Sequence, residues 1–298
     1  MSAGSRLAGR EAASVAALMA ALNARDARAL ASLYAEDAIT LVAGMPEVHG
    51  RDEVEHAHVA LFAAYPDIAF WAPRVWSDGN RVALEWGYHG TQTGCFLGAP
   101  PTGAFERRLG LSFTTYRDDG LIAREVTYID LAAAAIAAQT GRATRAPIVT
   151  SSRRHRASTG APIEAANRAV VERLCAALDA DDADGALAGL DDGIEYHDMT
   201  ASDGVTGKTA LRQLLARFTT AFRGVRVAVT ASLAAADFVV TECTMTATHG
   251  GPLGRFAATG KPVLLHVLLI AQLRAGTIVR GWTYANLGEL RSAIGGEP

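Results

Sequence analysis

The sequence is poor in cysteine and shows no export signal. Cys95, Cys175 and Cys243 are an odd number at wide spacings, without a CxxC pair. This spacing argues against a disulfide framework and against a zinc site built from cysteines. The N-terminus, Met1–Arg10, lacks the basic start, apolar middle and small-residue cleavage site of a secretory signal. We therefore expect a protein of the reducing cytoplasm, and no motif indicates a metal or an organic cofactor.

Long apolar runs and a strong net charge are also lacking. The longest runs, Leu131–Ala138 and Val263–Ala271 (interrupted by His266), are shorter than the roughly 20 residues that a membrane helix needs. The formal net charge of −3 provides no basic field for nucleic acid. We expect a soluble protein that binds neither membrane nor nucleic acid. The sequence also lacks three motifs at strand-to-helix junctions. These are GxGxxG of dinucleotide-binding proteins, GxxxxGK[ST] of P-loop proteins and GxSxG of hydrolases.

What the sequence does contain is an internal repeat. Val15–Tyr34 reads VAALMAALNARDARALASLY, and Val171–Leu190 reads VERLCAALDADDADGALAGL. Further matches follow in the same order, at an offset of about 155–160 residues. They pair Gly50-Arg51 with Gly207-Lys208, Tyr88-His89-Gly90 with Thr248-His249-Gly250, Pro101-Thr102-Gly103 with Ala258-Thr259-Gly260, and Arg124–Asp130 with Arg280–Asn286. This order indicates a tandem duplication of one domain.

Two domains also fit the length of 298 residues. Between the copies, Gly141–Pro162 is rich in Ser, Arg, Gly and Pro and has no apolar period, which is typical of a linker. We therefore predict one domain over residues 1–140, a linker over 141–162 and a second, more divergent domain over 163–298.

Each copy has helices first and strands afterwards. This order favours an α+β fold with a mainly antiparallel sheet over alternating β-α-β units. The expected helices are 12–19, 26–34, 51–64, 164–179, 183–190 and 208–222. The expected strands are 67–76, 81–90, 105–117, 121–130, 224–233, 237–248, 261–273 and 277–286.

The last strand of each copy has one large, partly aromatic side. Because successive side chains of a strand point to opposite sides, the residues divide by parity. One side carries Arg124, Val126, Tyr128 and Asp130 in the first copy, and Arg280, Trp282, Tyr284 and Asn286 in the second. We expect this side to line a ligand cavity.

The first copy resembles the SnoaL-like polyketide cyclases of the ketosteroid isomerase and nuclear transport factor 2 superfamily. The resemblance is carried by LYAEDA (33–38), HGRDEV (49–54), AAYPDI (63–68), HGTQTGCFLGAPPTG (89–103) and DGLIAREVTYID (119–130). In the second copy it is carried by EYHDM (195–199), GKTALRQLLARFTTAF (207–222) and GWTYAN (281–286). It implies two cone-shaped α+β barrels, each a curved sheet wrapped around helices with an internal apolar pocket. It also implies pairing through the outer sheet face, so we expect an intramolecular pseudo-dimer, with further homodimerisation left open.

Asp130 is the first candidate catalytic residue. The resemblance implies that an aspartate at this strand end is the acid/base for an intramolecular aldol closure. In an apolar site the charged form is disfavoured, so the pKa of a carboxyl moves up towards working pH. The alternative is that Asp130 caps a helix starting near Leu131.

Asp198 is the second candidate. Asn286 stands where the first copy has Asp130, and an amide cannot exchange a proton in the same way. Asp198 lies in EYHDM, similar to the place where ketosteroid isomerases and related epoxide-opening enzymes hold their base. The alternative is a turn or capping aspartate. His197 beside it would face the other way on a strand, although a loop could turn both inward.

Several other side chains are candidate substrate contacts. His266 interrupts an apolar strand and is either a pocket residue or a hydrogen-bonded core histidine. His89 and His249 recur before glycine, through shared structure or shared chemistry. His56 and His58, two apart on the expected helix, diverge too far to chelate a metal together. The predicted substrate-binding set is Tyr128, Trp86, His89, Arg124, His197, His266, Trp282, Tyr284 and Asn286.

We therefore predict a cofactor-independent cyclase or isomerase that closes a ring on a polyketide-like carbonyl compound by aldol-type acid/base catalysis. One alternative is an epoxide hydrolase, cyclase or dehydratase that uses Asp198 in the second domain. Another is a non-catalytic protein that binds an apolar small molecule.

Overall fold

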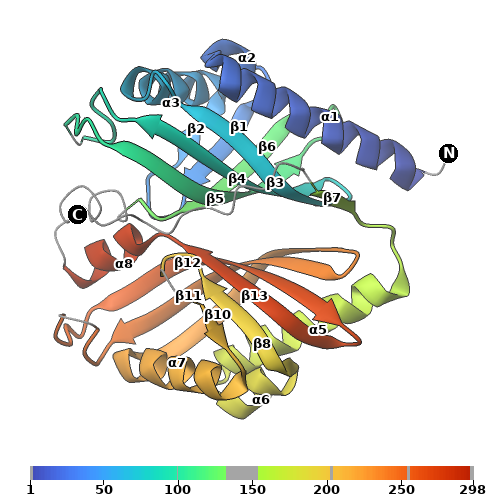
Figure 1. The fold of residues 1–298 in the computed structure, drawn as a ribbon, viewed down its shortest axis with the longest axis vertical. Coiled ribbons are helices and arrows are strands. Elements are labelled where there is room, and N and C mark those ends of the chain that lie inside the picture. The colour runs from blue at the N-terminus through green and yellow to red at the C-terminus, as the bar shows by residue number, and fades with distance from the viewer. Residues whose placement is uncertain (1–2, 99, 132–153, 202–203, 254–255, 296–298) are drawn as a thin grey trace. The chain divides into compact units, whose positions relative to one another are not determined.

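The computed structural model describes residues 3–98, 100–131, 154–201, 204–253 and 256–295. The chain divides into two compact units, one of Met1–Ile129 with Ala133–Ala157 and one of Asp130–Ala132 with Ser158–Pro298. Each unit combines helices with a single sheet (Figure 1), which confirms the prediction of two tandem α+β domains. None of the described helices has the length and apolar character needed to cross a membrane.

The first unit places three helices against one sheet. Its described strands run in the order β2-β1-β6-β5-β4-β3-β7, and β1 is parallel to β6. The elements are α1 (Ala3–Ala24), α2 (Ala27–Ala31), β1 (Tyr34–Val42), β2 (Val48–His49), α3 (Gly50–Ala64), β3 (Ala69–Asp78), β4 (Arg81–Thr91), β5 (Phe105–Tyr116), β6 (Ile122–Ile129) and β7 (Arg154–Ala157).

The second unit repeats this order. Its described strands run in the order β10-β11-β12-β13-β8-β9, and β8 is parallel to β13. The elements are α5 (Pro162–Asp179), α6 (Ala183–Ala188), β8 (Leu190–Asp198), β9 (Val205–Thr206), α7 (Lys208–Ala221), β10 (Phe222–Ala235), β11 (Phe238–His249), β12 (Pro262–Arg274), β13 (Thr277–Ala285) and α8 (Leu287–Ile294).

Neither sheet closes on itself, so the expected barrels are open sheets. Among the described strands, β2 and β7 are the edges of the first sheet, and β10 and β9 are the edges of the second. Register shifts that mark β-bulges interrupt the ladders, for example between Trp71 and Arg74. Such irregularities bend a strand and increase the local twist.

The second predicted helix of each copy is shorter than expected. Asp26 begins α2 by accepting a hydrogen bond from the Ala29 amide at 2.8 Å, and Asp182 begins α6 in the same way with Gly185 at 2.8 Å. The expected helix 26–34 nevertheless ends early, because Tyr34 already starts β1. The parallel pairing of β1 with β6 is a long-range contact that helical spacing in the sequence does not reveal.

Part of the predicted linker forms a strand. Residues 154–157 are β7, which pairs in parallel with β3 from Arg74↔Arg154 to Ser77↔Ala157. His155 Nε2 lies 3.0 Å from the Ser77 hydroxyl, which adds a side-chain contact to this edge. Residues 141–153 lie outside the described residues.

One side of the first sheet faces the helices. Val82 and Leu84 of β4 belong to the same buried cluster as Val15 and Leu18 of α1. Directly paired residues of neighbouring strands share a side, so Ser112 of β5, which pairs with Leu84, lies on it as well. We call this side of the sheet the helix-facing side.

The second sheet has a helix-facing side of the same construction. Val239 and Cys243 of β11 and Ala271 of β12 pack against Val171 and Cys175 of α5. The sulfur atoms of Cys175 and Cys243 are 4.0 Å apart, within hydrogen-bond contact, and neither cysteine forms a disulfide. Burial of this apolar side against helices is the main stabilising contribution that we expect in each unit.

Gly110 gives a direct test of this packing in the first unit. It pairs with Trp86, and a Cβ atom at Gly110 would lie 2.5 Å from Cζ2 of that indole. We expect Gly110→Ala to lower the free energy of unfolding by about 1–3 kcal/mol in urea, because the indole must move. Gly193→Ala in β8 is the matched control, since its Cβ would meet only Asp191 at 3.4 Å. Equal destabilisation by both changes would contradict this packing.

Candidate functional site

Between the helices and the first sheet lie ionisable side chains from three elements, of which Tyr34 is buried and Glu125 and His58 are half-buried. The Tyr34 hydroxyl of β1 donates a hydrogen bond to the Glu125 carboxylate of β6. Burial, with the charge of Glu125 beside it, raises the pKa of Tyr34 well above its ordinary value. Tyr34 therefore stays protonated and acts as a donor at neutral pH.

His58 of α3 lies within electrostatic reach of Glu125. Its Nδ1 atom is 2.8 Å from the carbonyl oxygen of Val54, one helical turn earlier. Burial lowers the pKa of His58 below its usual value. The hydrogen bond with the Val54 carbonyl and the charge of Glu125 both raise this pKa, but the effect of burial is larger. His58 is therefore a neutral imidazole at pH 7. We call Tyr34, His58 and Glu125 the Glu125 group.

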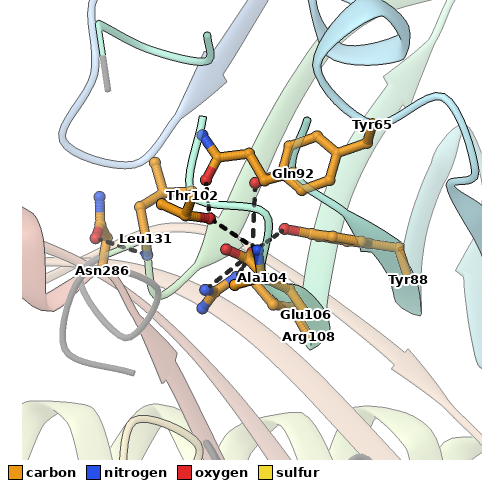
Figure 2. A network of polar contacts seen from close by, with 9 residues as sticks. All are labelled: Tyr65, Tyr88, Gln92, Thr102, Ala104, Glu106, Arg108, Leu131 and Asn286. Atoms are coloured by element: carbon orange, nitrogen blue, oxygen red, sulfur yellow. Dashed lines mark hydrogen bonds and ion pairs between the residues drawn. The ribbon is translucent and has the colours of Figure 1, made fainter. Parts of the chain in front are cut away.

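A second polar group lies at the other end of β4 and β5 (Figure 2). Arg108 donates from both Nε and Nη2 to Glu106 Oε2 at 3.1 Å, and the hydroxyls of Tyr65 and Tyr88 approach the same oxygen at 3.3 and 3.5 Å. Burial raises the pKa of Tyr88 to about 12 and raises the pKa of Tyr65 further. Both phenols therefore remain neutral, and Arg108 balances the charge of Glu106.

Trp86, Ser112 and Thr127 lie between these two groups. The Trp86 indole donates from Nε1 to the Ser112 hydroxyl at 3.0 Å, and Ser112 is 3.0 Å from the Thr127 hydroxyl. The Phe70 ring lies 6.2 Å from Trp86 and 5.8 Å from Tyr88. The helix-facing side thus offers aromatic surface together with proton donors, a carboxylate and a neutral imidazole, which are the groups that acid/base chemistry uses.

The second unit lacks nearly all of these groups. The two hairpins start at equivalent pairs, Asp78↔Arg81 and Ala235↔Phe238, and so align the repeats at an offset of about 157 residues. At the positions of Tyr34, His58, Glu106, Arg108, Ser112 and Glu125, the second unit has Leu190, Leu215, Val263, Leu265, Leu269 and Gly281. The ionisable groups are therefore a property of the first copy and not of the shared fold.

The predicted binding residues of the first unit lie on two different sides of the sheet. Trp86 is on the helix-facing side. Tyr128 pairs with Leu111, and both lie on the opposite side, together with Arg124 and His89. The parity of the strand was predicted correctly, and whether the side with Tyr128 lines a ligand cavity stays a prediction. Alternation alone does not say which side meets the helices, and here the side with Glu125 and Thr127 does.

Asp130 directly follows the end of β6 and is half-buried. It is grouped with the second unit. The segment over which it was expected to cap a helix, beyond Leu131, lies outside the described residues. Its role as the acid/base stays a prediction.

The aromatic residues of the last strand of the second unit also lie opposite its helix-facing side. Trp282 pairs with Ile270 and stacks between His197 and Phe238, with ring centroids 6.1 and 6.4 Å apart. Tyr284 shares this side, because it lies two residues further along β13. Trp282, Tyr284 and His197 therefore lie on the side away from the helices, and their role in substrate binding stays a prediction.

Asp198 does lie on the helix-facing side of the second sheet. It pairs with Thr283, whose hydroxyl accepts a hydrogen bond from Tyr196 at 2.8 Å. Asp198 Oδ1 accepts hydrogen bonds from the Thr200 amide at 2.9 Å and the Thr200 hydroxyl at 2.7 Å. These bonds match the turn-capping alternative and leave a functional role as a prediction.

Asn286 and His266 have structural partners near α8. Buried Asn286 begins the helix by accepting from the Gly288 amide at 3.0 Å, and it also accepts from the Leu131 amide, which belongs to the same unit, at 3.3 Å (Figure 2). His266 pairs through Nδ1 with Glu289 at 2.7 Å, and its backbone amide donates to the same carboxylate at 2.9 Å. Of its two interpretations, the hydrogen-bonded histidine describes what the structure shows.

His249 is the structural equivalent of Gln92 and not of His89. The backbone oxygen of His249 accepts a hydrogen bond from the Gly260 amide at 2.9 Å, and that of Gln92 accepts one from the Gly103 amide at 2.9 Å. Each also contacts a matching hydroxyl, with His249 Nδ1 3.0 Å from Thr259 and Gln92 Oε1 2.9 Å from Thr102. The match of His89 with His249 in the sequence was therefore wrong by three positions.

Sequence reasoning missed the Glu125 group and the pair of Glu106 with Arg108. Glu125 has the opposite parity to the side of its strand that is expected to line a cavity, and the sequence suggests His58 only as a metal ligand, a role that its spacing from His56 excludes. A usable signal was present in the repeat itself, because Glu125 and His58 are ionisable in one copy and replaced by Gly281 and Leu215 in the other.

The sequence matches the model of the SnoaL-like domain twice, over residues 15–125 and 171–281. Similar solved structures include AclR, a candidate hydroxylase from Streptomyces galilaeus, which is 24% identical with a TM-score of 0.42, covering 45% of this chain and 99% of that one. A candidate SnoaL-like polyketide cyclase from Jannaschia sp. CCS1 is 20% identical with a TM-score of 0.43, over 46% and 97% of the two chains. An LEH-like epoxide hydrolase from M. tuberculosis is 21% identical with a TM-score of 0.38, over 45% and 92%. No curated protein matches the sequence.

The equivalence of His249 and Gln92 predicts that glutamine can replace His249 without loss of stability. His249 Nε2 is buried without a hydrogen-bond partner among the described residues, whereas the Gln92 amide donates to carbonyl oxygens of its own loop. We expect His249→Gln to keep the free energy of unfolding at or above that of the wild type. His249→Leu should lower it by about 0.5–1.5 kcal/mol, because leucine cannot replace the contact with the Thr259 hydroxyl. Equal losses in both variants, measured by urea unfolding, would argue against the equivalence.

Proposed function

Because the chain belongs to the SnoaL-like domain family, we propose that it is a cofactor-independent cyclase or isomerase. It closes a ring or shifts a proton on a polyketide-like carbonyl compound by acid/base catalysis of the aldol type. The reaction takes place on the helix-facing side of the first sheet. The same proposal describes a cytoplasmic enzyme that acts on an apolar small molecule.

The observation that supports this proposal is the difference between the two copies. Buried ionisable groups are costly to keep in the interior of a unit unless they are paired. The second unit shows that this fold accommodates Leu190, Leu215 and Gly281 where the first unit has Tyr34, His58 and Glu125. Stability therefore does not require the Glu125 group, and function is the better explanation for it.

The chemistry of the site suits a carbonyl compound. Phe70, Trp86 and Tyr88 offer ring surfaces for an apolar, partly aromatic molecule. A proton taken from the carbon next to a carbonyl leaves an enolate, and hydrogen-bond donors placed at its oxygen stabilise it. Site groups of this kind contribute on the order of 10²–10⁴ in rate each.

Asp130 and Glu125 are competing candidates for the essential carboxylate. Asp130 is proposed from the family resemblance, and Glu125 is supported by its place on the helix-facing side with a Tyr34 hydrogen bond. Isosteric amides distinguish them, because each change removes one charge and nearly preserves the shape.

We expect the protein to catalyse exchange of the proton next to the carbonyl of 2-tetralone, a simple aromatic ketone, for deuterium in D₂O. The disappearance of the corresponding ¹H NMR signal measures the rate. Glu125→Gln should lower this rate by about 100-fold, whereas Asp130→Asn should leave it within a factor of about three.

If Asp130→Asn lowers the rate and Glu125→Gln does not, Asp130 is the essential carboxylate, and the proposed type of reaction still stands. An exchange rate of the wild type no higher than that of buffer with a denatured sample would overturn the proposed function itself.

A further inference from the structure

We propose that His58 is the catalytic base, the group that removes the proton from the carbon next to the substrate carbonyl. This inference rests on the proposed function and assigns the proton-accepting atom within it, Nε2 of His58.

The helix itself determines which nitrogen of His58 is basic. A backbone carbonyl only accepts hydrogen bonds, so the contact of Nδ1 with the Val54 oxygen at 2.8 Å requires the hydrogen on Nδ1. In the neutral ring, Nε2 then carries the lone pair. Among the described residues, Nε2 has no hydrogen-bond partner, so its lone pair is available to a substrate.

The His58 ring lies on the side of α3 that packs towards the sheet. His58 packs on Phe62 of the same helix, with ring centroids 6.0 Å apart, and Phe62 is buried. The charge of Glu125, on the helix-facing side of β6, reaches the ring. His58 therefore faces the sheet, whereas His56, two residues earlier on α3, is exposed.

Three charged or titratable groups are linked to one another on this side of the sheet, and the charge of one of them, Glu125, acts on the His58 ring. Glu125 of β6 is the anion, and Tyr34 of β1 donates its hydroxyl to that carboxylate. Arg51 of α3 is the cation, and its guanidinium donates from Nε and Nη2 to the Tyr34 backbone oxygen at 2.9 and 2.8 Å. The arrangement keeps the guanidinium on the backbone of β1, while the carboxylate balances a positive charge that arises on His58.

The proposed step is a balanced proton transfer. His58 Nε2 forms a bond to the proton, the C–H bond next to the carbonyl breaks, and its electron pair becomes an enolate. The imidazolium, now protonated on both nitrogens, is stabilised by the Glu125 charge. It then returns the proton to carbon in an isomerisation, or to the new alkoxide oxygen after the enolate carbon has attacked a second carbonyl. No oxidant, reductant or metal takes part.

Glu125 is less suited to this step than His58. Its Oε2 atom already accepts the Tyr34 hydroxyl, so this oxygen is engaged within the protein. Its fixed negative charge serves the step better by stabilising the imidazolium. We therefore assign proton transfer to His58 and stabilisation of the charged ring to Glu125.

The test compares His58→Leu and His58→Gln with His56→Leu, using 2-tetralone exchange in D₂O with the full chain. Leu occupies the equivalent position 215 of the second unit, so the fold tolerates it there, and Gln is a second polar replacement. Both His58 variants should lose at least about 100-fold in exchange rate. His56→Leu should keep the wild-type rate, because His56 lies on the exposed side of the helix.

The pH profile separates a base from a merely structural residue. The active form is the neutral imidazole, so the wild-type rate should fall as the pH drops through the pKa of His58. Because burial lowers the pKa of His58, the midpoint should lie below 6.5, the ordinary pKa of a histidine side chain. This inflection should be missing from the residual activity of both His58 variants.

The tautomer provides a readout that is independent of turnover. In ¹⁵N-histidine-labelled protein at pH 7, long-range ¹H–¹⁵N spectra should show His58 with the hydrogen on Nδ1 and an unprotonated Nε2. A hydrogen on Nε2, or wild-type exchange in both His58 variants, would overturn the assignment of His58 while the proposed function stands. A wild type without exchange activity would overturn both.

Discussion

The first unit depends on one constraint, which is that the side of a sheet packed against helices contains little water. A polar group in such a place must find its hydrogen bonds within the protein, because an unsatisfied one costs about 1–3 kcal/mol. The first unit meets this requirement by pairing its polar groups, as with Tyr34 and Glu125 or Arg108 and Glu106. Nε2 of His58, on the same side of the sheet, has no hydrogen-bond partner among the described residues, which is why it is the atom to which we assign proton transfer.

The two copies meet the same constraint in opposite ways. The second unit replaces most of the ionisable groups with Leu and Val, which need no partner. It keeps the parts that build the fold, such as the aspartate caps of α2 and α6 and the hydroxyl contacts of Gln92 and His249. Framework interactions have been retained, and the acid/base groups lie in one copy. A duplicated domain thus provides an internal control for separating structure from function.

Much of the fold could be predicted from the sequence, because repeats and alternation are local patterns. The α+β class, the tandem copies and the long strands around Tyr88 and Tyr128 all follow from such patterns. β1, β8 and β7 could not be predicted in this way, since their pairing depends on distant strands. The same limit applies to the site. Parity separates Glu125 from Tyr128 but does not say which of them meets the helices, because tertiary packing decides that.

The most direct measurement of the central claim uses the four tryptophans. Trp86 lies on the helix-facing side of the first sheet. The other three, Trp71 and Trp76 of the first sheet and Trp282 of the second, lie on the side of their sheet that faces away from its helices. In protein labelled with 5-fluorotryptophan, each ¹⁹F resonance is assigned by a single Trp→Phe change, and 2-tetralone is then titrated in. The account predicts a saturable shift confined to Trp86. A shift at Trp282 with an unchanged Trp86 would contradict it and would place ligand binding outside the first unit's helix-facing side.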